Sequence, residues 1–446
     1  MADAINRVPR ATGDVVPSEP GRHGDILPIV THATISELDP PCPGAPAEAI
    51  TPIAPGARTR TSTESTGPRP LRTIRQPFDT IPPATWDTLA ASTPWATPFS
   101  RWGVQRAWWD AYGANAHDQT LVVVDDAAPD DAMPIAIVPL MHRHEVEPDD
   151  AILRTRMRGA GHAAPLTPVA PDRKAVFFGA SYHADYATVL ARPADLPAVA
   201  RAVADALASD ATAGDEHPEP WDVIDLRRLR CGDPAADQLA TAFGAHLASD
   251  GWTVVREREE VCPVLDLAPG LGFEGYLGTL GKKERHEVRR KIRRAEAAGE
   301  VRLERSTDPV GDLDAFVDLH QGKWGADGLF PPTPGGAQSR AFFRGLFEHC
   351  GPNGLIALHF LTVGGRRIAA GIWFDDGETL YFYNAGVDPE ARELSPGVVL
   401  VARSIEMALE AGRSRFDFLR GDEPYKYGWG AVDVPIQRLL VVRTVR

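Results

Sequence analysis

The apolar residues of this chain recur with two alternating spacings from residue 71 onward. Where they return every three or four positions, the spacing predicts helices, and these cover residues 81–89, 97–112, 196–208, 233–250, 273–277, 282–298, 313–323, 337–350 and 396–411. Where they alternate with polar residues or form short runs between turn residues, the pattern predicts strands, which cover residues 119–124, 134–140, 187–190, 221–226, 252–257, 355–363, 367–374, 379–385 and 416–419. Helices and strands mixed in this order predict an α/β (α+β mixed) fold.

Composition divides the chain into a tail and two halves. Residues 1–70 contain no aromatic residue and hold 12 of the 40 prolines. Such a segment buries too little apolar surface to offset the entropy that is lost on ordering, so we expect a disordered tail. Residues 71–262 and 263–446 have a similar length and a similar order of elements. We therefore expect two tandem domains, each a mixed twisted sheet flanked by helices.

The charge and the cysteines restrict the class of protein further. The net charge is −14, from 47 basic and 61 acidic residues, which disfavours duplex nucleic acid as a partner. No apolar run is long enough to span a bilayer, and the start of the chain does not resemble a signal peptide, so we expect a cytoplasmic protein. The four cysteines lie far apart without a C-x-x-C pair, which predicts neither a metal site nor a disulfide framework.

A short turn between a predicted strand and a predicted helix carries the spacing Arg392-x-x-Ser395-x-Gly397. Backbone N–H groups at a helix N-terminus attract anions, and small residues let a phosphate approach them. Pro396 suits the first helical turn, where its missing N–H costs nothing. The turn therefore predicts a site for the pyrophosphate of a nucleotide-like cofactor. Taken alone, the local pattern favours an ordinary helix start in which Ser395 is the capping residue.

The segment 413–430 begins as a strand and then gathers ionisable and aromatic side chains. Within the nine residues that follow Gly421 lie Asp422, Glu423, Tyr425, Lys426, Tyr427 and Trp429. A folding core does not need that density straight after a strand, whereas enzymes assemble their chemistry from polar groups at strand ends. We interpret this segment as part of a ligand site.

The predicted helix 282–298 is strongly basic. Between positions 282 and 294 it carries eight Lys or Arg residues against Glu284 and Glu287. Arg285, Arg289 and Arg293 form one row of like charges, which repel one another and slightly favour a bound anion. The candidate anions are the phosphates of a cofactor, a nucleotide-linked sugar, tRNA and a membrane surface. A solvated helix face is the alternative.

Together these motifs resemble the GNAT acyltransferase superfamily. Its acyl-CoA signature is Arg/Gln-x-x-Gly-x-Gly/Ala between a strand and a helix, and Ser395 stands here at the first Gly position. The ending from Asp417 to Gly430, with Tyr-Lys-x-x-Trp-Gly, is similar to that of the CelD-like acyltransferases, a GNAT branch first associated with cellulose biosynthesis and related to the FemAB peptidoglycan transferases. Weaker agreement extends the resemblance over about residues 75–446 and lies in the basic helix, Thr97-Pro-Phe, Ile137-Val-Pro-Leu140 and Asp185-Tyr186.

The resemblance implies an acyl-CoA-dependent N- or O-acyltransferase that acts on a sugar or on another precursor of the cell envelope or its polysaccharides, with no metal. Each half would be a GNAT-like domain, and the first would lack a cofactor site. An aminoacyl-tRNA-dependent Fem-like transferase is one alternative. A degenerate GNAT scaffold that only binds a metabolite or a partner is another, and peripheral membrane contact stays open.

For the donor, the resemblance implies a site between two splayed strands, here 379–385 and 416–419. The backbone N–H groups from Asn384 to Gly386 would face the thioester carbonyl. Arg392, Ser395 and Gly397 would hold the pyrophosphate of acetyl-CoA or another acyl-CoA.

For the chemistry, the resemblance implies that Tyr425 protonates the leaving thiolate and that Lys426 stabilises the oxyanion or the acceptor. Asp417 and Glu423 are the candidate bases. Burial of Asp417 as a partner of Arg420 is an equal alternative to its role as a base. The candidates for binding the acceptor or another anion are Arg285, Arg289, Trp324 and Arg420.

Overall fold

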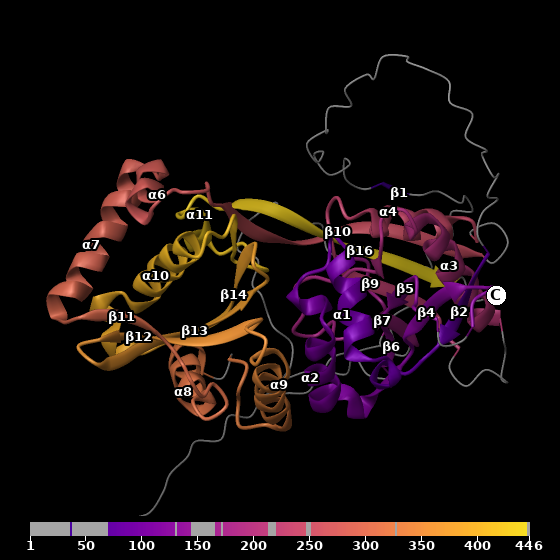
Figure 1. The fold of residues 1–446 in the computed structure, drawn as a ribbon, viewed down its shortest axis with the longest axis horizontal. Helices are drawn as coiled ribbons and strands as arrows, with labels where there is room; N and C mark the ends of the chain where they lie inside the picture. The colour runs from indigo at the N-terminus through magenta and orange to yellow at the C-terminus, as the bar shows by residue number, and fades with distance from the viewer. Residues whose placement is uncertain are drawn as a thin grey trace, which may run out of the picture. The chain divides into compact units, whose positions relative to one another are not determined.

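The computed structural model describes residues 36–37, 70–129, 132–143, 166–170, 173–212, 220–246, 251–325 and 328–443. The expected disordered tail lies almost entirely outside these residues. Residues 35–446 belong to one compact unit. Its described residues confirm the mixed α/β fold predicted from the sequence (Figure 1).

The first half of the chain combines strands with four α-helices among its described residues. The elements are β1 Ser36–Glu37, β2 Leu71–Arg75, α1 Pro83–Ser92, α2 Trp102–Tyr112, β3 Ala116–Asp118, β4 Leu121–Asp125, β5 Ala136–Val138, β6 Leu140–Arg143, β7 Ala175–Phe178, β8 Leu190–Ala191, α3 Leu196–Thr212, β9 Val223–Arg230 and α4 Pro234–Gly244.

The second half has longer strands. Its elements are β10 Trp252–Asp266, α6 Phe273–Thr279, α7 Lys282–Ala298, β11 Val301–Arg305, α8 Leu313–Trp324, α9 Pro334–Cys350, β12 Ile356–Val363, β13 Arg366–Asp375, β14 Thr379–Val387, the 3-10 helix η7 Pro389–Leu394, α10 Pro396–Glu410, β15 Arg415–Asp417, α11 Pro424–Tyr427 and β16 Val432–Arg443.

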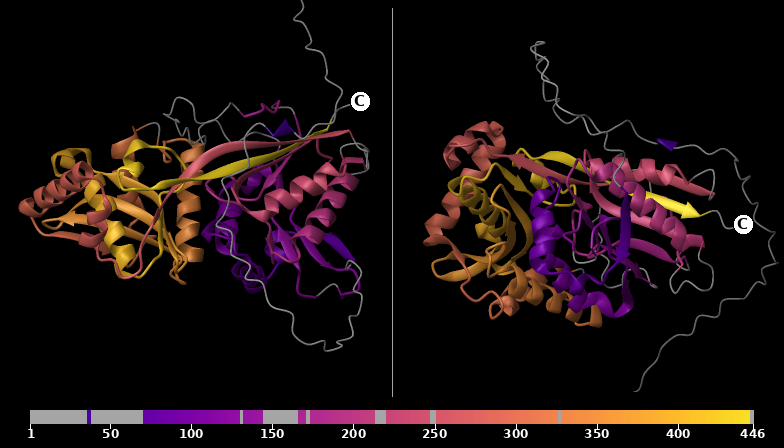
Figure 2. Two further views of the ribbon diagram at one scale, coloured as in Figure 1. Left: turned by 90° about the horizontal axis from the view of Figure 1, so that it is seen from above. Right: turned by 45° about the vertical axis from the view of Figure 1, so that its right-hand side comes forward.

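One sheet runs through both halves. Among the described residues it has 12 strands, in the order β11-β12-β13-β14-β15-β10-β16-β9-β7-β6-β3 with β1 beside β10. Strands β10 and β16 are long antiparallel neighbours that reach from one half into the other (Figure 1, Figure 2). The domain boundary expected after residue 262 falls inside β10, and β16, which pairs with β10 along its length, pairs on its other side with β9 of the first half. A second sheet has the order β2-β4-β5-β8.

Helices cover both faces of the sheet in the second half. Alternate side chains of β13 point to opposite faces, as they must in a strand. Ile372 packs with Phe316 of α8 and Phe342 of α9, whereas Trp373 packs with Val399 of α10. Helices α8 and α9 thus cover one face, and α10 and α7 lie on the other (Figure 1).

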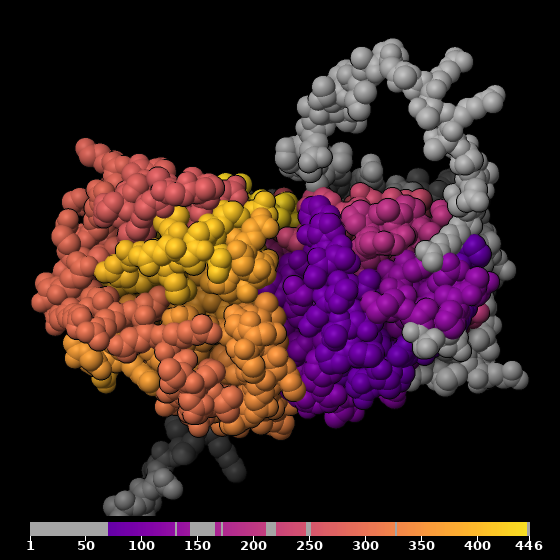
Figure 3. Space-filling view, viewed as in Figure 1, coloured from indigo at the N-terminus to yellow at the C-terminus, as the bar shows by residue number. Residues whose placement is uncertain are grey.

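Helices α2 and α9 pack against each other through small residues. The indigo and orange parts of the chain, which hold these helices, abut in the space-filling view (Figure 3). A Cβ placed on Gly345 of α9 would lie 3.1 Å from the Cβ of Ala107. A Cβ placed on Gly103 of α2 would lie 2.8 Å from the sulfur of Cys350. Larger side chains at either glycine would push the helices apart.

Some sequence expectations need correction. Strands β1, β2, β3, β7, β11 and β16 were not predicted, and the single strand expected over residues 134–140 is divided into β5 and β6. Cys231 is disulfide-bonded although no disulfide framework was expected, because distance along the chain does not decide which cysteines meet in a fold. Cys262 and Cys350 are free and buried. No helix in the described part of the chain is long and apolar enough to cross a membrane.

Candidate active site

Strands β14 and β15 run in parallel for only three residue pairs and then separate. The last pair is Tyr381 with Asp417. On its other edge β14 stays paired with β13 up to Val387, but the register shifts between Ile372 and Trp373. Tyr383 is therefore an extra residue in β14, which makes a β-bulge and bends the strand. We call the place where residues 382–387 leave residues 418–421 the fork.

The predicted phosphate turn lies where η7 meets α10. Ser395 has left-handed backbone angles (φ 54°, ψ 52°), and its side chain makes no capping hydrogen bond. The alternative in which the Ser395 side chain caps the helix is therefore not what the structure has. Arg392 is exposed, and its carbonyl accepts the Ser395 N–H at 3.1 Å. A Cβ on Gly397 would meet within 4 Å only Val387, at 3.8 Å, so the space beside this glycine is open.

The end of β14 lies against helix α8. A Cβ on Gly386 would lie 2.3 Å from the backbone nitrogen of His320, so only glycine lets the helix approach this closely. The Asn384 side-chain oxygen accepts the Ala385 N–H at 3.0 Å. Of the three N–H groups expected to face a thioester, that of Ala385 is thus already engaged, and Gly386 has a packing role that explains its identity.

Asp417 lies buried where the fork opens. Its carboxylate accepts hydrogen bonds from the Tyr186 hydroxyl and the Leu419 N–H, both at 2.7 Å. Desolvation raises the pKa of Asp417 to about 6, against the lowering by these hydrogen bonds. Arg420 is not its partner, because the Arg420 guanidinium pairs with Asp185 at 2.9 Å and Glu260 at 3.2 Å.

These two carboxylates also bear on the anion role expected of Arg420. The guanidinium is 9% exposed, and the carboxylates beside it raise its pKa against the lowering by desolvation. The structure thus places Arg420 in an internal ion pair rather than at a surface that a ligand can reach.

Lys426 is the centre of the turn that follows β15. Its buried ammonium donates hydrogen bonds to the carbonyls of Leu419, Arg420 and Gly421 at 2.9 to 3.0 Å. The three carbonyls converge because Leu419 and Gly421 have positive φ angles of 57° and 110°. Glu423 forms an ion pair with the same ammonium at 2.9 Å. All three protons of Lys426 are thus used inside the protein.

Tyr425 and Tyr427 are the exposed aromatic residues of this cluster. Tyr425 lies on α11, is 48% exposed, and its ring meets Phe418 edge-on at 6.1 Å. Desolvation, and then the nearby Glu423 carboxylate, raise the pKa of the Tyr425 hydroxyl. The hydroxyl therefore keeps its proton at neutral pH, as a group that donates a proton must.

The end of α8 faces the same cluster. Lys323 lies 4.4 Å from the Trp324 ring, which is 45% exposed. Desolvation lowers the pKa of Lys323, and the Glu423 carboxylate opposes that shift. The ring of Trp324, which was expected to bind the acceptor, lies beside Lys323 and His320 of its own helix.

A family comparison agrees with this arrangement. Residues 282–427 match the family described as acetyltransferase (GNAT) domain. Over this segment the chain is similar to GNAT acetyltransferases. The matched segment contains the basic helix, the fork, the phosphate turn and the cluster up to Tyr427. The prediction of an acetyltransferase-like enzyme is thus confirmed. None of the curated proteins matches the chain.

Solved structures include proteins of similar fold. The structure of FemX shares 11% identity at a TM-score of 0.51, covering 82% of this chain and 96% of FemX. A tandem GNAT protein from the clavulanic acid biosynthesis pathway shares 8% identity at a TM-score of 0.43, covering 84% of this chain and 99% of that protein. The likeness to FemX shows that the two proteins share a fold, and it says nothing about the substrate of this chain.

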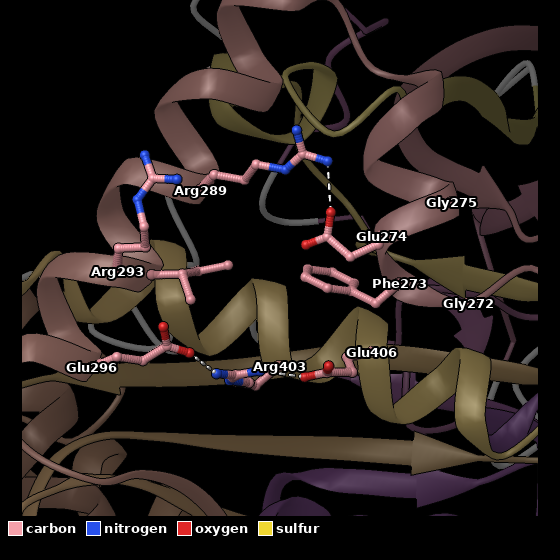
Figure 4. A pocket seen from close by; sticks show the side chains of 10 residues that line it. Gly272, Phe273, Glu274, Gly275, Arg289, Arg293, Glu296, Arg403 and Glu406 are labelled. Carbon is pink, nitrogen blue, oxygen red and sulfur yellow. Dashed lines mark hydrogen bonds and ion pairs between the residues drawn. The ribbon is translucent and has the colours of Figure 1, made fainter.

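The basic helix of the matched segment borders a pocket of about 750 Å³ between α6, α7 and α10 (Figure 4). Arg289 and Glu274, which both line the pocket, form an ion pair at 2.6 Å. Arg403 forms ion pairs with Glu296 and Glu406. Arg285 donates to the Gly278 carbonyl at 3.0 Å. Both arginines expected to bind an anion are therefore engaged locally.

Another arginine connects the helix to the phosphate turn. Arg294 of α7 donates to the carbonyl of Glu393 at 3.0 Å, within η7. Its charge lies nearer the turn than the two arginines chosen from the sequence. Among the described residues no group of His, Cys, Asp or Glu could hold a metal ion.

Proposed function

We propose that this enzyme transfers an acyl group from acyl-CoA to an amine or a hydroxyl of a sugar or of another cell-envelope or polysaccharide precursor. The observation that carries the proposal is the parallel pair β14 and β15, which separates after Tyr381 and Asp417 and is joined by the helix whose N-terminus holds the phosphate turn. A long, thin donor that ends in phosphates suits such a place, because one end can lie between the strands and the other at the helix.

The donor phosphates would bind at the start of α10. In α10 Pro396 has no N–H and the Val398 N–H donates to the Ser395 carbonyl at 3.0 Å, so the Gly397 N–H and the helix dipole are what attract an anion there. The open space beside Gly397 lets a phosphate approach the backbone there. Arg392 is exposed at the same turn and adds a cation, and a charge-assisted hydrogen bond to phosphate is among the stronger polar contacts.

The reaction would follow from groups around the fork. The acceptor nitrogen or oxygen attacks the thioester carbon, the carbon–sulfur bond breaks, and the sulfur takes the proton of the Tyr425 hydroxyl. The N–H groups of Asn384 and Gly386 are the candidates that stabilise the oxyanion. The acceptor gives its own proton to a base, for which Glu423 is better placed than Asp417 because its side chain is 38% exposed.

A sugar acceptor is consistent with the exposed Trp324 ring, since an aromatic ring offers an apolar face to the C–H side of a pyranose. The resemblance of residues 417–430 to the CelD-like branch supports the same substrate class. The test is release of free thiol from acetyl-CoA with a panel of amino sugars, polyols and simple amines. Thiol release with none of them, together with firm CoA binding, would favour a scaffold that only binds its ligand.

A second candidate function is aminoacyl-tRNA-dependent transfer. It is favoured by Lys282, Lys283 and Arg293 of α7, which are exposed and have no ion-pair partner within the described part of the chain. This candidate predicts tRNA binding whose affinity falls steeply with salt, with a smaller slope after Lys283→Ala and Arg293→Ala. Salt-independent or absent tRNA binding contradicts it.

A further inference from the structure

A five-residue segment of the first half contacts residues of both strands at the fork. We call residues 182–186 the brace. The backbone carbonyl of His183 accepts the Tyr383 hydroxyl at 2.9 Å. The Tyr186 hydroxyl donates to Asp417 at 2.7 Å. Between them, Asp185 accepts Arg420 at 2.9 Å. His183, Asp185 and Tyr186 are all buried.

The brace is held in one conformation. His183 has a φ of 70°, which is uncommon for a residue with a side chain. Its ring shares a 2.8 Å hydrogen bond with the Tyr112 hydroxyl and stacks on Phe342 at 4.6 Å. A strained backbone of this kind persists only where its surroundings fix it, and such sites often serve function. The brace is therefore a rigid support.

The brace contacts both strands of the fork, β14 and the segment that continues β15, which we call its limbs. Tyr383 is the extra residue of the β14 bulge, and Asp417 is the last paired residue of β15. Arg420 leaves the same turn and is also held by Glu260 of β10. One rigid segment thus bonds to both strands at the point where they separate.

We propose that the brace sets the separation of the two limbs, so that the first half of the chain positions the donor site of the second. Tyr186, Asp185 and His183 are positioning residues, because they act through Asp417, Arg420 and Tyr383. This inference rests on the proposed function for its link to acyl-CoA. It assigns a role to the half of the chain that was expected to lack a cofactor site.

The experiment removes single hydroxyl groups. Tyr186→Phe and Tyr383→Phe each delete one bond between the brace and a limb. The control is Tyr276→Phe, because the Tyr276 hydroxyl is also buried and donates to a backbone carbonyl, that of Trp429, at 2.6 Å, without touching the brace. Two readouts are used: the Kd of CoA by calorimetry, and hydrogen exchange of the amides of residues 382–387 without ligand.

The brace predicts coupling between the limbs. Tyr186→Phe, which removes a bond only at β15, should speed amide exchange in residues 382–387 of β14 and weaken CoA binding about fivefold, as expected for one buried hydrogen bond. Together with Tyr383→Phe, the loss should be smaller than the product of the two single effects, because both act on one separation. Tyr276→Phe should lower the Tm and change neither readout.

Two results separate the claims. Unchanged exchange in residues 382–387 of Tyr186→Phe overturns the brace, whatever happens to stability. Wild-type protein that binds no CoA contradicts the proposed function, while coupled exchange in the same samples still supports the brace.

Discussion

Replacing Lys426 by methionine should unfold the protein more readily rather than only stop its chemistry. Methionine keeps the length and much of the volume of the side chain but has no ammonium group. The three carbonyls of Leu419, Arg420 and Gly421, now 2.9 to 3.0 Å from that ammonium, would lose their donor inside the protein. Leu419 would keep its left-handed φ of 57° without the group that stabilises it.

The size of the effect follows from these contacts. A hydrogen bond to a charged group contributes about 1.5–3 kcal/mol, and each buried acceptor left without a donor costs about 1–3 kcal/mol. The pair with Glu423 adds little, because that carboxylate is 38% exposed and screened by water. We therefore expect a loss of about 3–5 kcal/mol in the free energy of unfolding.

The assay is urea unfolding followed by fluorescence and circular dichroism, beside thiol release. The control is Lys291→Met, because Lys291 makes a single, partly exposed ion pair with Glu287 at 3.3 Å and should lose about 1 kcal/mol or less. A Lys426→Met protein with wild-type stability but no activity would refute the structural role. That result would support the role expected from the sequence, in which Lys426 stabilises the oxyanion or the acceptor.

Three further predictions concern neighbouring residues. Tyr425→Phe should lower kcat by about a hundredfold or more without changing stability, as measured by thiol release, if its hydroxyl is the acid; wild-type kcat contradicts this. Asp417 has a pKa raised to about 6 in the folded state, so its contribution to stability is present below pH 4 and is lost as pH rises through 6. In urea unfolding, the free energy of unfolding of Asp417→Asn relative to that of wild type should therefore rise by about 3 kcal/mol from pH 4 to pH 7. A difference between the two proteins that does not change with pH contradicts a raised pKa of the buried Asp417 carboxyl. Gly386→Ala should lose about 2 kcal/mol or more of stability, because the added Cβ would lie 2.3 Å from the backbone of α8. Gly397→Ala should fold normally and bind CoA more weakly. Equal stability of the two variants in urea unfolding refutes the packing role of Gly386.

Local patterns predicted much of the second half. The basic helix was predicted with the bounds it has, Lys282–Ala298, because its apolar positions are periodic and Gly299 ends it. The hairpins from β12 to β14 followed from Gly364-Gly365 and from the turn after Asp375. The phosphate turn and the cluster after β15 are each contiguous in sequence, so their residues were visible together.

The features that could not be predicted depend on contacts between residues far apart in the sequence or on backbone angles that the residue type does not indicate. The partners of Arg420 are Asp185, more than two hundred positions earlier, and Glu260 of β10. The role of Lys426 depends on the φ angle of Leu419, which the residue type does not indicate. Strand β16 pairs with β9 of the other half and contains Pro435, a residue that argues against a strand interior.

The central claim is that acyl-CoA binds at the start of α10. Calorimetry of CoA binding to wild type, Arg392→Glu and Arg340→Glu tests it most directly. Arg340 is an arginine of α9 that pairs with Asp314 of α8, on the face of the sheet opposite to α10. We predict that wild type and Arg340→Glu bind CoA alike and that Arg392→Glu binds it at least about tenfold more weakly, as loss of a charged phosphate contact implies. CoA binding of equal strength in all three proteins, or none in wild type, would contradict the account.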